Sequence, residues 1–402
     1  MNKRKILNDP VHGFITIPSE FIFEIMNNPC VQRLSRIRQL GMTYLVYPGA
    51  LHTRFNHAIG AMHLIDIAIE VLRNKGFEIS NEEKQSTLAA ILLHDVGHGP
   101  FSHALENSLI HDVSHEKISL LLMERLNKEF DNKLSMAIEI FKGTYKKKFL
   151  HQLVSGQLDV DRIDYLTRDS FFTGVSEGII GTERLLKMMT ISEDELAVEE
   201  KGIYSVERFI ISRRLMYWQV YYHKTVLAAE QMLIAVLKRA QEIALSGTKI
   251  FAPPALMFFL SKKTKEKDLN FDALTNFIEI DDSDILSSLK VWQHHEDKVL
   301  SYLSKSLLNR KLFRVIIDVK KDPENDEKKC TEIMKKYDIS KNEIPYFFGY
   351  GEIKNDAYNP KTDKIWISYR DGSRKDITEA SDQLNYGLIS KTVVKNFIYH
   401  PK

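Results

Sequence analysis

Three histidines and an aspartate crowd into the twelve residues LLHDVGHGPFSH, at positions 92 to 103. The stretch follows an apolar run and is broken by two glycines and Pro100, residue types that end helices. Imidazoles and carboxylates bind divalent metals and also carry protons. We therefore expect a buried helix that stops at His98 and presents His94 and Asp95 at the edge of a cleft.

Two further segments supply the same ligand types. HTRFNH carries Arg54 and His57, and DVDRIDYLTRD, residues 159 to 169, is rich in carboxylates. Adjacent residues on a helix point about 100° apart, so His94 and Asp95 share one ion only along an edge, and other helices must complete the site. This donor set suits Mn, Fe, Mg or Zn. The predicted ligands of the divalent metal ion are His57, His94, Asp95 and Asp161.

The spacing in residues 159 to 169 predicts one functional helix face. Asp161, Tyr165 and Asp169 are four residues apart, which places them in a line on a helix. A metal ligand, an aromatic ring and a second carboxylate would then face one cleft. Asp159 is the expected N-cap, and Asp164 lies off this face, so neither is given a role in the site.

Two other interpretations of these residues are weaker. A single histidine at the end of an apolar helix is usually structural, but here four candidate ligands occur together, with an arginine three residues before the first. A zinc peptidase is suggested by the H-x-x-x-H spacing of His94 and His98, but Asp95 stands where that motif needs Glu. The peptidase interpretation also leaves His57 and Asp161 without a function.

The elements that must position these residues are mostly helical. Hydrophobic periodicity predicts helices over 54 to 76, 86 to 95 and 114 to 126, with Ser114 as the N-cap of the last, and one very long helix over 205 to 244. We expect a hairpin over 195 to 205 with its turn at Lys201-Gly202.

The pattern changes near residue 311. LFRVIIDV and KIWISYRDGS are typical of strands, and ENDEKKCTEIMKKY of an exposed helix between them. The sequence thus predicts a mainly α protein with a helical domain over residues 1–310 and a small α+β domain over 311–402.

Composition limits the class of protein. With 56 basic and 54 acidic residues, the formal charge of +2 argues against a general binder of nucleic acid or membrane surfaces. Only Cys30 and Cys330 occur, too few and too far apart for a disulfide framework or a thiolate metal site. No uninterrupted apolar segment reaches about 18 residues, and MNKRKILNDP lacks the apolar run of a signal peptide. We expect a cytoplasmic protein.

Longer strings carry a family resemblance. KILNDPVHG, QLGMTYLVYPGALHTRFNHAIG, HDVGHGPFSH and YYHK resemble the HD-domain phosphohydrolases, and among them the deoxynucleoside triphosphate triphosphohydrolases, in the branch of the mammalian sterile-alpha-motif and HD enzyme and its bacterial homologues. The resemblance implies an HD-type helical core that binds metal through the four predicted ligands. It also implies hydrolysis of deoxynucleoside triphosphates (dNTPs) between the α-phosphate and the sugar 5′ oxygen, which releases deoxynucleoside and tripolyphosphate.

The resemblance also implies roles for individual residues. The proton carriers and their carboxylate partners would be His98, His103, His115, Glu106 and Glu116, where Glu106 replaces the family's Asp. Guanidinium groups bind phosphate oxygens in pairs, which suits Arg54 for the α-phosphate and Arg162 and Arg213 for the outer phosphates. The sugar would be held by Gln39 and Asp169 at its 3′ hydroxyl, and ribose excluded by Leu40, Tyr165 and Tyr221.

Regulation and alternatives follow from the same resemblance. Lys5, Asn8, Gln32, Arg310 and Arg314 match positions that bind nucleotide effectors between subunits of related tetramers, which implies a homo-oligomer, dimer or tetramer, and a nucleotide effector. Asn27 and Ser35 replace the Asp and Arg that help to read guanine at that effector site, and Tyr222 replaces a Gln near the substrate base. Two alternatives to a dNTP triphosphohydrolase stay open: an HD phosphohydrolase acting on another phosphorylated nucleotide, and a non-catalytic nucleotide sensor.

Overall fold

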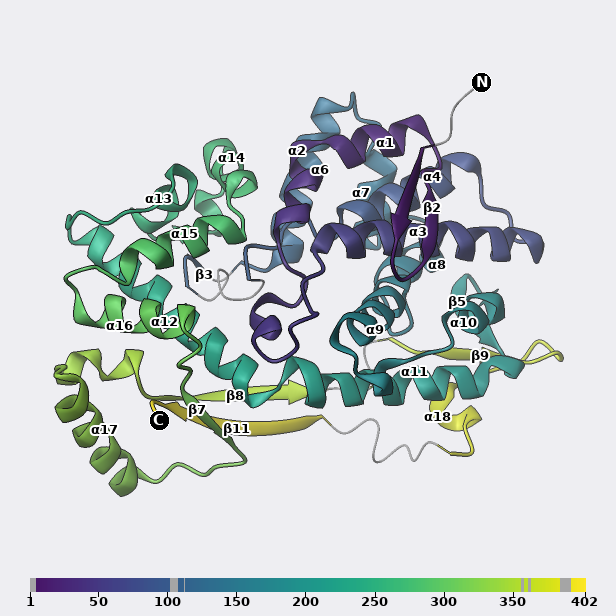
Figure 1. Cartoon of the computed structure of the whole chain (residues 1–402). Coiled ribbons are helices and arrows are strands. Elements are labelled where there is room, and N and C mark those ends of the chain that lie inside the picture. The colour runs from purple at the N-terminus through teal and green to yellow at the C-terminus, as the bar shows by residue number, and fades with distance from the viewer. Residues whose placement is uncertain (1–4, 102–107, 112, 356–357, 361–362, 384–391) are drawn as a thin grey trace.

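The computed structural model describes residues 5–101, 108–111, 113–355, 358–360, 363–383 and 392–402. Its centre is a pair of adjacent helices, α3 (Arg54–Asn74) and α4 (Asn81–Leu93). Helices between residues 20 and 173 lie around this pair, whereas the helices between residues 254 and 308 lie together on the other side of the molecule (Figure 1). The prediction of a mainly α protein is therefore confirmed.

The other helices are α1 (Glu20–Asn27), α2 (Pro29–Gln32), α6 (His115–Glu129), α7 (Ser135–Lys142), α8 (Lys148–Val154), α9 (Val160–Thr173), α10 (Thr182–Met188), α11 (Ile203–Met216), α12 (Lys224–Leu245), α13 (Pro254–Leu260), α14 (Phe271–Glu279), α15 (Asp282–Trp292), α16 (Lys298–Leu308), α17 (Pro323–Tyr337) and α18 (Ile377–Ala380). The strands form four small sheets in the part of the chain that is described. Two of them are two-stranded, β1 (Ile6–Asp9) with β2 (Gly13–Thr16) and β3 (Ile110–His111) with β6 (Thr264–Lys265).

Helix α3 forms where the periodicity predicts it. Thr53 caps its N-terminus in a capping box with Asn56, and the helix ends before Gly76, whose φ of 91° favours glycine. By length and composition α3 is apolar enough to cross a membrane, but 61% of its most apolar window is buried inside the protein. This burial is typical of the core helix of a globular fold.

The single long helix predicted over 205 to 244 is wrong. The chain forms α11, then a π-helical turn over Tyr217–Tyr221, and then α12. His223 adopts an extended conformation and its Nδ1 accepts a hydrogen bond from the Thr225 amide, so a new helix starts there. A π-turn shifts the register of side chains within one helical segment, an effect that hydrophobic periodicity does not reveal.

The hairpin predicted over 195 to 205 is also misplaced. The two strands are β4 (Met189–Ser192) and β5 (Glu195–Glu199), and their turn is at Glu193 and Asp194, both with positive φ. Lys201 and Gly202 instead lie in a short 3₁₀ turn that leads into α11. The strand pairing therefore lies several residues earlier than the Lys-Gly turn signal indicates.

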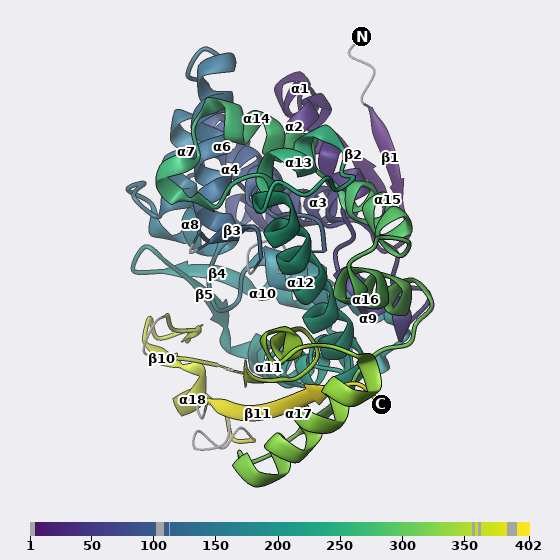
Figure 2. The ribbon, with the colours of Figure 1, turned by 90° about the vertical axis from the view of Figure 1, so that its left-hand side faces the viewer.

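The strands and the exposed helix predicted after residue 311 are confirmed. Strands β7 (Arg314–Ile317), β11 (Val393–His400) and β8 (Gly349–Asn355) form an antiparallel sheet, and α17 lies near them (Figures 1 and 2). Strands β9 (Trp366–Ser368) and β10 (Arg374–Asp376) extend the β4–β5 hairpin instead, with β9 parallel to β5. The C-terminal segment is therefore joined to the helical part by a shared sheet, and the division at residue 310 stays a prediction.

Candidate active site

The turn after α4 places two of the predicted metal ligands. The helix ends at Leu93, earlier than the predicted end at His98, and His94 is its C-cap. Hydrogen bonds from the Val96 amide to Leu93 and from the His98 amide to Asp95 hold the following turn. His94 and Asp95 consequently lie in a non-helical turn, which also removes the helix that a zinc peptidase motif needs.

Gly97 serves close packing in this turn. A Cβ atom there would lie 2.1 Å from the carbonyl oxygen of His115 and 2.4 Å from the amide nitrogen of Ser119. Ser119 Oγ accepts from the Gly97 amide at 2.9 Å and donates to the His94 carbonyl at 2.6 Å. Helix α6, which Ser114 caps as predicted, therefore holds the ligand-bearing turn directly.

The predicted ligands come together from three helices. His57 lies in the first turn of α3, and Asp161 in the first turn of α9. One ligand atom each from His57, His94 and Asp161 lies within 4.8 Å of the others. His57 Nε2 is 2.8 Å and His94 Nε2 is 3.2 Å from Asp161 Oδ1. Asp95 lies beside them, with Oδ1 3.3 Å from His94 Nε2.

The hydrogen bonds around the two imidazoles fit a metal site. His57 Nδ1 is 2.8 Å from Asp164 Oδ2, and His94 Nδ1 is 2.6 Å from the Ile91 carbonyl oxygen. Because a carbonyl and a carboxylate accept, each Nδ1 carries a proton, and Nε2 is the nitrogen that would bind a metal next to Asp161. A cation bound here would take the place of the proton that His57 Nε2 shares with Asp161 in the metal-free protein. The donor set of two imidazoles and carboxylates suits a divalent transition metal or zinc.

The pKa values show how strongly these groups interact. Burial alone lowers the pKa of His57, but hydrogen bonds to Asp161 and Asp164 raise it to about 10. Burial raises the pKa of Asp95, yet His94, His98 and Arg54 hold it well below the usual range. In the metal-free site, the carboxylate of Asp95 is therefore ionised and the imidazole of His57 is protonated at neutral pH.

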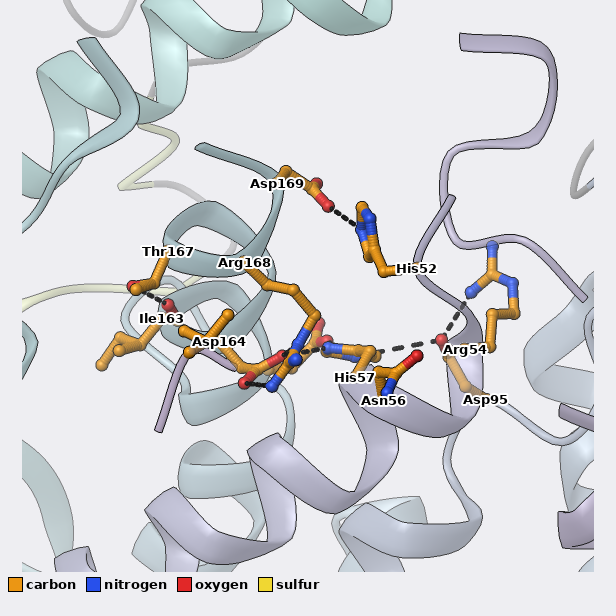
Figure 3. A network of polar contacts seen from close by, with 12 residues as sticks. His52, Arg54, Asn56, His57, Asp95, Ile163, Asp164, Thr167, Arg168 and Asp169 are labelled. Atoms are coloured by element: carbon orange, nitrogen blue, oxygen red, sulfur yellow. Dashed lines mark hydrogen bonds and ion pairs between the residues drawn. The ribbon is translucent and has the colours of Figure 1, made fainter. Parts of the chain in front are cut away.

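Asp164 is a residue that the sequence reasoning missed. It is fully buried, and its side chain bonds His57 and Arg168 (Figure 3). It also bonds His12, whose Nε2 lies 2.6 Å from its Oδ1. Asp161 and Asp164 approach the two nitrogens of one imidazole from adjacent turns of α9. The spacing of three residues between the two aspartates was the signal that could have revealed this.

The predicted phosphate-binding arginines line the same region but are already engaged. Arg54 Nη1 lies 2.5 Å from Asp95 Oδ2, and Arg162 Nε lies 3.1 Å from Asp159 Oδ2 (Figure 3 shows the first pair). Asp159 is the N-cap of α9, as predicted. The guanidinium of Arg213 lies 5.8 Å from the ring centre of Tyr217.

Three of the predicted sugar-binding residues, Tyr165, Asp169 and Tyr221, lie together at α9. Tyr221 donates to Asp169 Oδ2 at 2.7 Å, and the rings of Tyr165 and Tyr221 are 6.3 Å apart. The backbone amide of Gln39 donates to the carbonyl of His52 at 3.0 Å, and His52 in turn bonds Asp169. Leu40 is half-buried against the core.

His52 is a second residue that the sequence reasoning missed. It is 3% exposed, and its Nε2 lies 2.8 Å from Asp169 Oδ1 (Figure 3). Its ring stacks on Phe172, with 4.5 Å between the ring centres. Its place two residues before Arg54 in HTRFNH was the available signal. Both oxygens of Asp169 thus have a partner, His52 on one and Tyr221 on the other.

Of the predicted proton carriers and their carboxylate partners, the structure describes His98, His115 and Glu116. His98 is buried, with Nε2 3.3 Å from Asp95 Oδ1, and its ring stacks on that of His115 at 3.8 Å. Glu116 is exposed on the first turn of α6. His103 and Glu106 lie outside the residues that the structure describes.

The predicted effector-binding residues occupy two separate places. Lys5 bonds Glu20 at 3.0 Å, Asn8 lies in β1, and Gln32 donates to the Met26 carbonyl. Arg310 donates to the Leu45 carbonyl, and Arg314 begins β7. In Figure 1 β1 and β7 lie on different sides of the molecule.

Comparisons with known proteins agree with this geometry. The sequence model of the HD domain matches residues 54–169, and that of the HD associated region matches residues 180–253. A crystal structure of a phosphohydrolase from Bacteroides thetaiotaomicron is 51% identical over the whole of both chains, with a TM-score of 0.96. The uncharacterized protein YwfO of Bacillus subtilis is 31% identical, covering 100% of this chain and 93% of that protein.

The deoxynucleoside triphosphate triphosphohydrolase SAMHD1 of Homo sapiens is more distant. It is 28% identical over 60% of this chain, and the match spans 46% of the human protein. The chain described here belongs to the HD-domain phosphohydrolase superfamily. Within that superfamily it lies in the branch that resembles the SAMHD1 triphosphohydrolases.

Proposed function

We propose that this protein is a metal-dependent dNTP triphosphohydrolase, which converts a dNTP and water to deoxynucleoside and tripolyphosphate. One observation carries the proposal: helix α9 bears a metal ligand, Asp161, and two turns later Asp169, which is bonded to His52 and Tyr221. Eight residues of helix span about 12 Å, a length that fits a phosphate at one end and a sugar at the other.

The metal centre would act on the α-phosphate. The cluster of His57, His94 and Asp161, with Asp95 beside it, would hold the divalent ion, which when bound polarises the phosphate and orients the attacking water. Arg54, at 2.5 Å from Asp95, lies where its guanidinium could turn to the phosphate oxygens. Arg162 and Arg213 would contact the outer phosphates.

The departing 5′ oxygen is a poor leaving group, so a general acid must protonate it. His98 and His115 form a stacked pair beside Asp95, and with His103 and its neighbour Glu106 they are the candidates for that role. Glu116, exposed on the first turn of α6, stays the further carboxylate candidate that the family resemblance implies.

At the sugar, the proposal assigns recognition and exclusion to different groups. Asp169 and Gln39 would bind the 3′ hydroxyl, because the Asp169 carboxylate oxygens have lone pairs beyond those used by His52 and Tyr221. The rings of Tyr165 and Tyr221, with Leu40, would occupy the space that a 2′ hydroxyl needs.

We also infer a cytoplasmic homo-oligomer that responds to a nucleotide effector. The two groups of effector-binding candidates lie apart in one chain, and this separation favours a site assembled between copies. The near-neutral formal charge of +2 argues against nucleic acid and membrane surfaces as partners. Sedimentation with and without dNTPs tests this inference.

The enzymatic proposal is tested with the purified protein. It is incubated with Mn²⁺ or Mg²⁺ and each dNTP, singly and as a mixture that supplies any effector, and the products are separated by chromatography. We expect equal amounts of deoxynucleoside and tripolyphosphate from wild type and none from Asp161→Ala. Absence of both products under every condition refutes the proposal. If only ribonucleotides or monophosphates are turned over, the protein is a phosphohydrolase with another substrate. If nucleotides bind tightly and none is turned over, the protein is a nucleotide sensor.

A further inference from the structure

The β1–β2 hairpin reaches the metal site through buried hydrogen bonds. His12, in the turn between the strands, has its Nε2 2.6 Å from Asp164 Oδ1. The other oxygen of Asp164 is 2.8 Å from His57 Nδ1. The His12 side chain is 8% exposed, and those of Asp164 and His57 are fully buried. A single carboxylate therefore separates the hairpin from a metal ligand that lies 45 residues further along the chain.

Arg168 provides a second connection between the hairpin and Asp164. Its guanidinium donates to both oxygens of Asp164, at 2.9 and 3.0 Å, and to Asp9 Oδ2 at 2.7 Å. Asp9 Oδ1 in turn accepts from the amides of Val11 and His12, at 3.0 and 2.9 Å. Asp9 therefore fixes Arg168 and also the turn that carries His12.

The hydrogen bonds of Asp164 fix the orientation of the His57 ring. Asp164 accepts from His12, His57 and Arg168, so its oxygens are satisfied without water. An unpaired buried carboxylate would be costly, and a fully paired one is held rigidly. Because Asp164 accepts the proton of His57 Nδ1, Nε2 is the nitrogen that would bind a metal beside Asp161.

Gly60 in α3 leaves room for the side chains of Asp164 and Arg168. A Cβ atom at Gly60 would lie 2.1 Å from Arg168 Nη2 and 2.2 Å from Asp164 Oδ1. Gly60 is three residues after His57, so it lies on the same face of α3. Only a glycine at this position lets Asp164 and Arg168 approach the helix so closely.

We propose that Asp9 and His12 are positioning residues of the metal centre, because they hold Asp164 and, through it, orient His57 toward the metal. The inference rests on the metal centre of the proposed function. It adds to the metal centre a hairpin that precedes residues 54–169, the part of the chain that matches the HD domain.

The test measures metal binding without nucleotide. Free Mn²⁺ is followed by electron paramagnetic resonance during titration of the full-length protein. Loss of an outer contact to a ligating histidine typically weakens metal binding about 10- to 100-fold, and we expect this loss in His12→Ala. His12→Gln should retain most of the affinity, because its amide nitrogen can donate from near the position of Nε2.

His63→Ala is the matched control. Its imidazole lies on α3 with its ring centre 5.9 Å from that of His12, but no hydrogen bond to Asp164 is found for it among the described residues. We expect wild-type affinity for Mn²⁺ in this variant. Thermal unfolding of each metal-free variant is measured in parallel, so that a loss of affinity is separated from a loss of folding.

Three results would overturn the inference. If folded His12→Ala and wild type bind Mn²⁺ equally well while Asp161→Ala abolishes binding, the positioning role of His12 is refuted and the metal centre is not. If His12→Ala does not fold, Asp9→Asn replaces it, and equal affinity in Asp9→Asn has the same meaning. Mn²⁺ binding that is unaffected by Asp161→Ala refutes the metal centre, and this inference falls with it.

Discussion

His52 and Asp169 form a buried hydrogen bond, with the imidazole Nε2 2.8 Å from the carboxylate Oδ1. The two residues are 117 positions apart in the chain, and Tyr221 bonds the second oxygen of the same carboxylate. Asp169 is therefore held from both sides at the proposed sugar site. This arrangement makes the orientation of Asp169 dependent on a histidine that has no part in the metal centre.

Replacement of His52 should impair sugar recognition more than chemistry. In His52→Ala we expect KM for dNTPs to rise about tenfold and kcat to change less. A tenfold rise corresponds to the free energy of about one hydrogen bond to a charged group. Steady-state kinetics on wild type, His52→Ala and His52→Gln measures this effect, and the Gln variant should be close to wild type. Dideoxynucleotides, which lack the 3′ hydroxyl, provide the control, since their KM should change little. An equal rise for both substrates would contradict a role through Asp169.

Removal of the Tyr165 ring should relax discrimination against ribose. The ring lies 6.3 Å from that of Tyr221, and together they are proposed to fill the space of a 2′ hydroxyl. In Tyr165→Ala the ratio of kcat/KM for a dNTP to that for the matching ribonucleotide should fall, by up to roughly 100-fold. Tyr165→Phe keeps the ring and should keep the ratio. Unchanged discrimination in Tyr165→Ala would show that other residues exclude ribose.

A methyl group at Gly60 should destabilise the protein. Because its Cβ would overlap Arg168 and Asp164, Gly60→Ala forces a shift in buried charged groups, and we expect a loss of about 1–3 kcal/mol in the free energy of unfolding. Gly181→Ala is the control, since its Cβ would meet only Arg184 Cβ, at 4.0 Å. Urea denaturation of the three proteins measures the difference. Equal stability of Gly60→Ala and Gly181→Ala would mean that the network adapts to the methyl group.

Metal binding should strengthen as pH rises. Although burial lowers it, the pKa of His57 in the metal-free protein is raised to about 10 by Asp161 and Asp164. A metal must displace this proton near neutral pH, so the Mn²⁺ affinity should rise by up to about tenfold per pH unit for each proton released. Calorimetry between pH 6.5 and 8.5, in buffers of different ionisation enthalpy, measures the released protons. An affinity independent of pH would contradict this prediction.

The same pKa sets the pH dependence of stability without metal. A histidine whose pKa is raised on folding stabilises fully below its unfolded value near 6.5, and this contribution is lost as pH rises toward 10. The metal-free protein should therefore become less stable over this range. Thermal unfolding with and without Mn²⁺ compares the two forms, and Mn²⁺ should increasingly offset the loss as pH rises.

The sequence alone determined the ligand types and most of the elements that carry them. Helix α3, the cap of α6 at Ser114 and the line of Asp161, Tyr165 and Asp169 on α9 all follow from local patterns. Such patterns are readable because helix periodicity and capping depend on residues a few positions apart. The same reasoning brought His57, His94 and Asp161 together, since their side-chain types share one chemistry.

Only the tertiary structure decided which groups support the ligands and where the chain departs from regular helix. The contacts of Asp164 with His12 and His57 span 152 and 107 residues, and that of Asp169 with His52 spans 117, so no local pattern contains them. The π-turn at Tyr217–Tyr221 changes side-chain register without interrupting the apolar pattern. Partners across the core are selected by packing and by the need to pair buried charge, and both depend on the folded arrangement of distant segments.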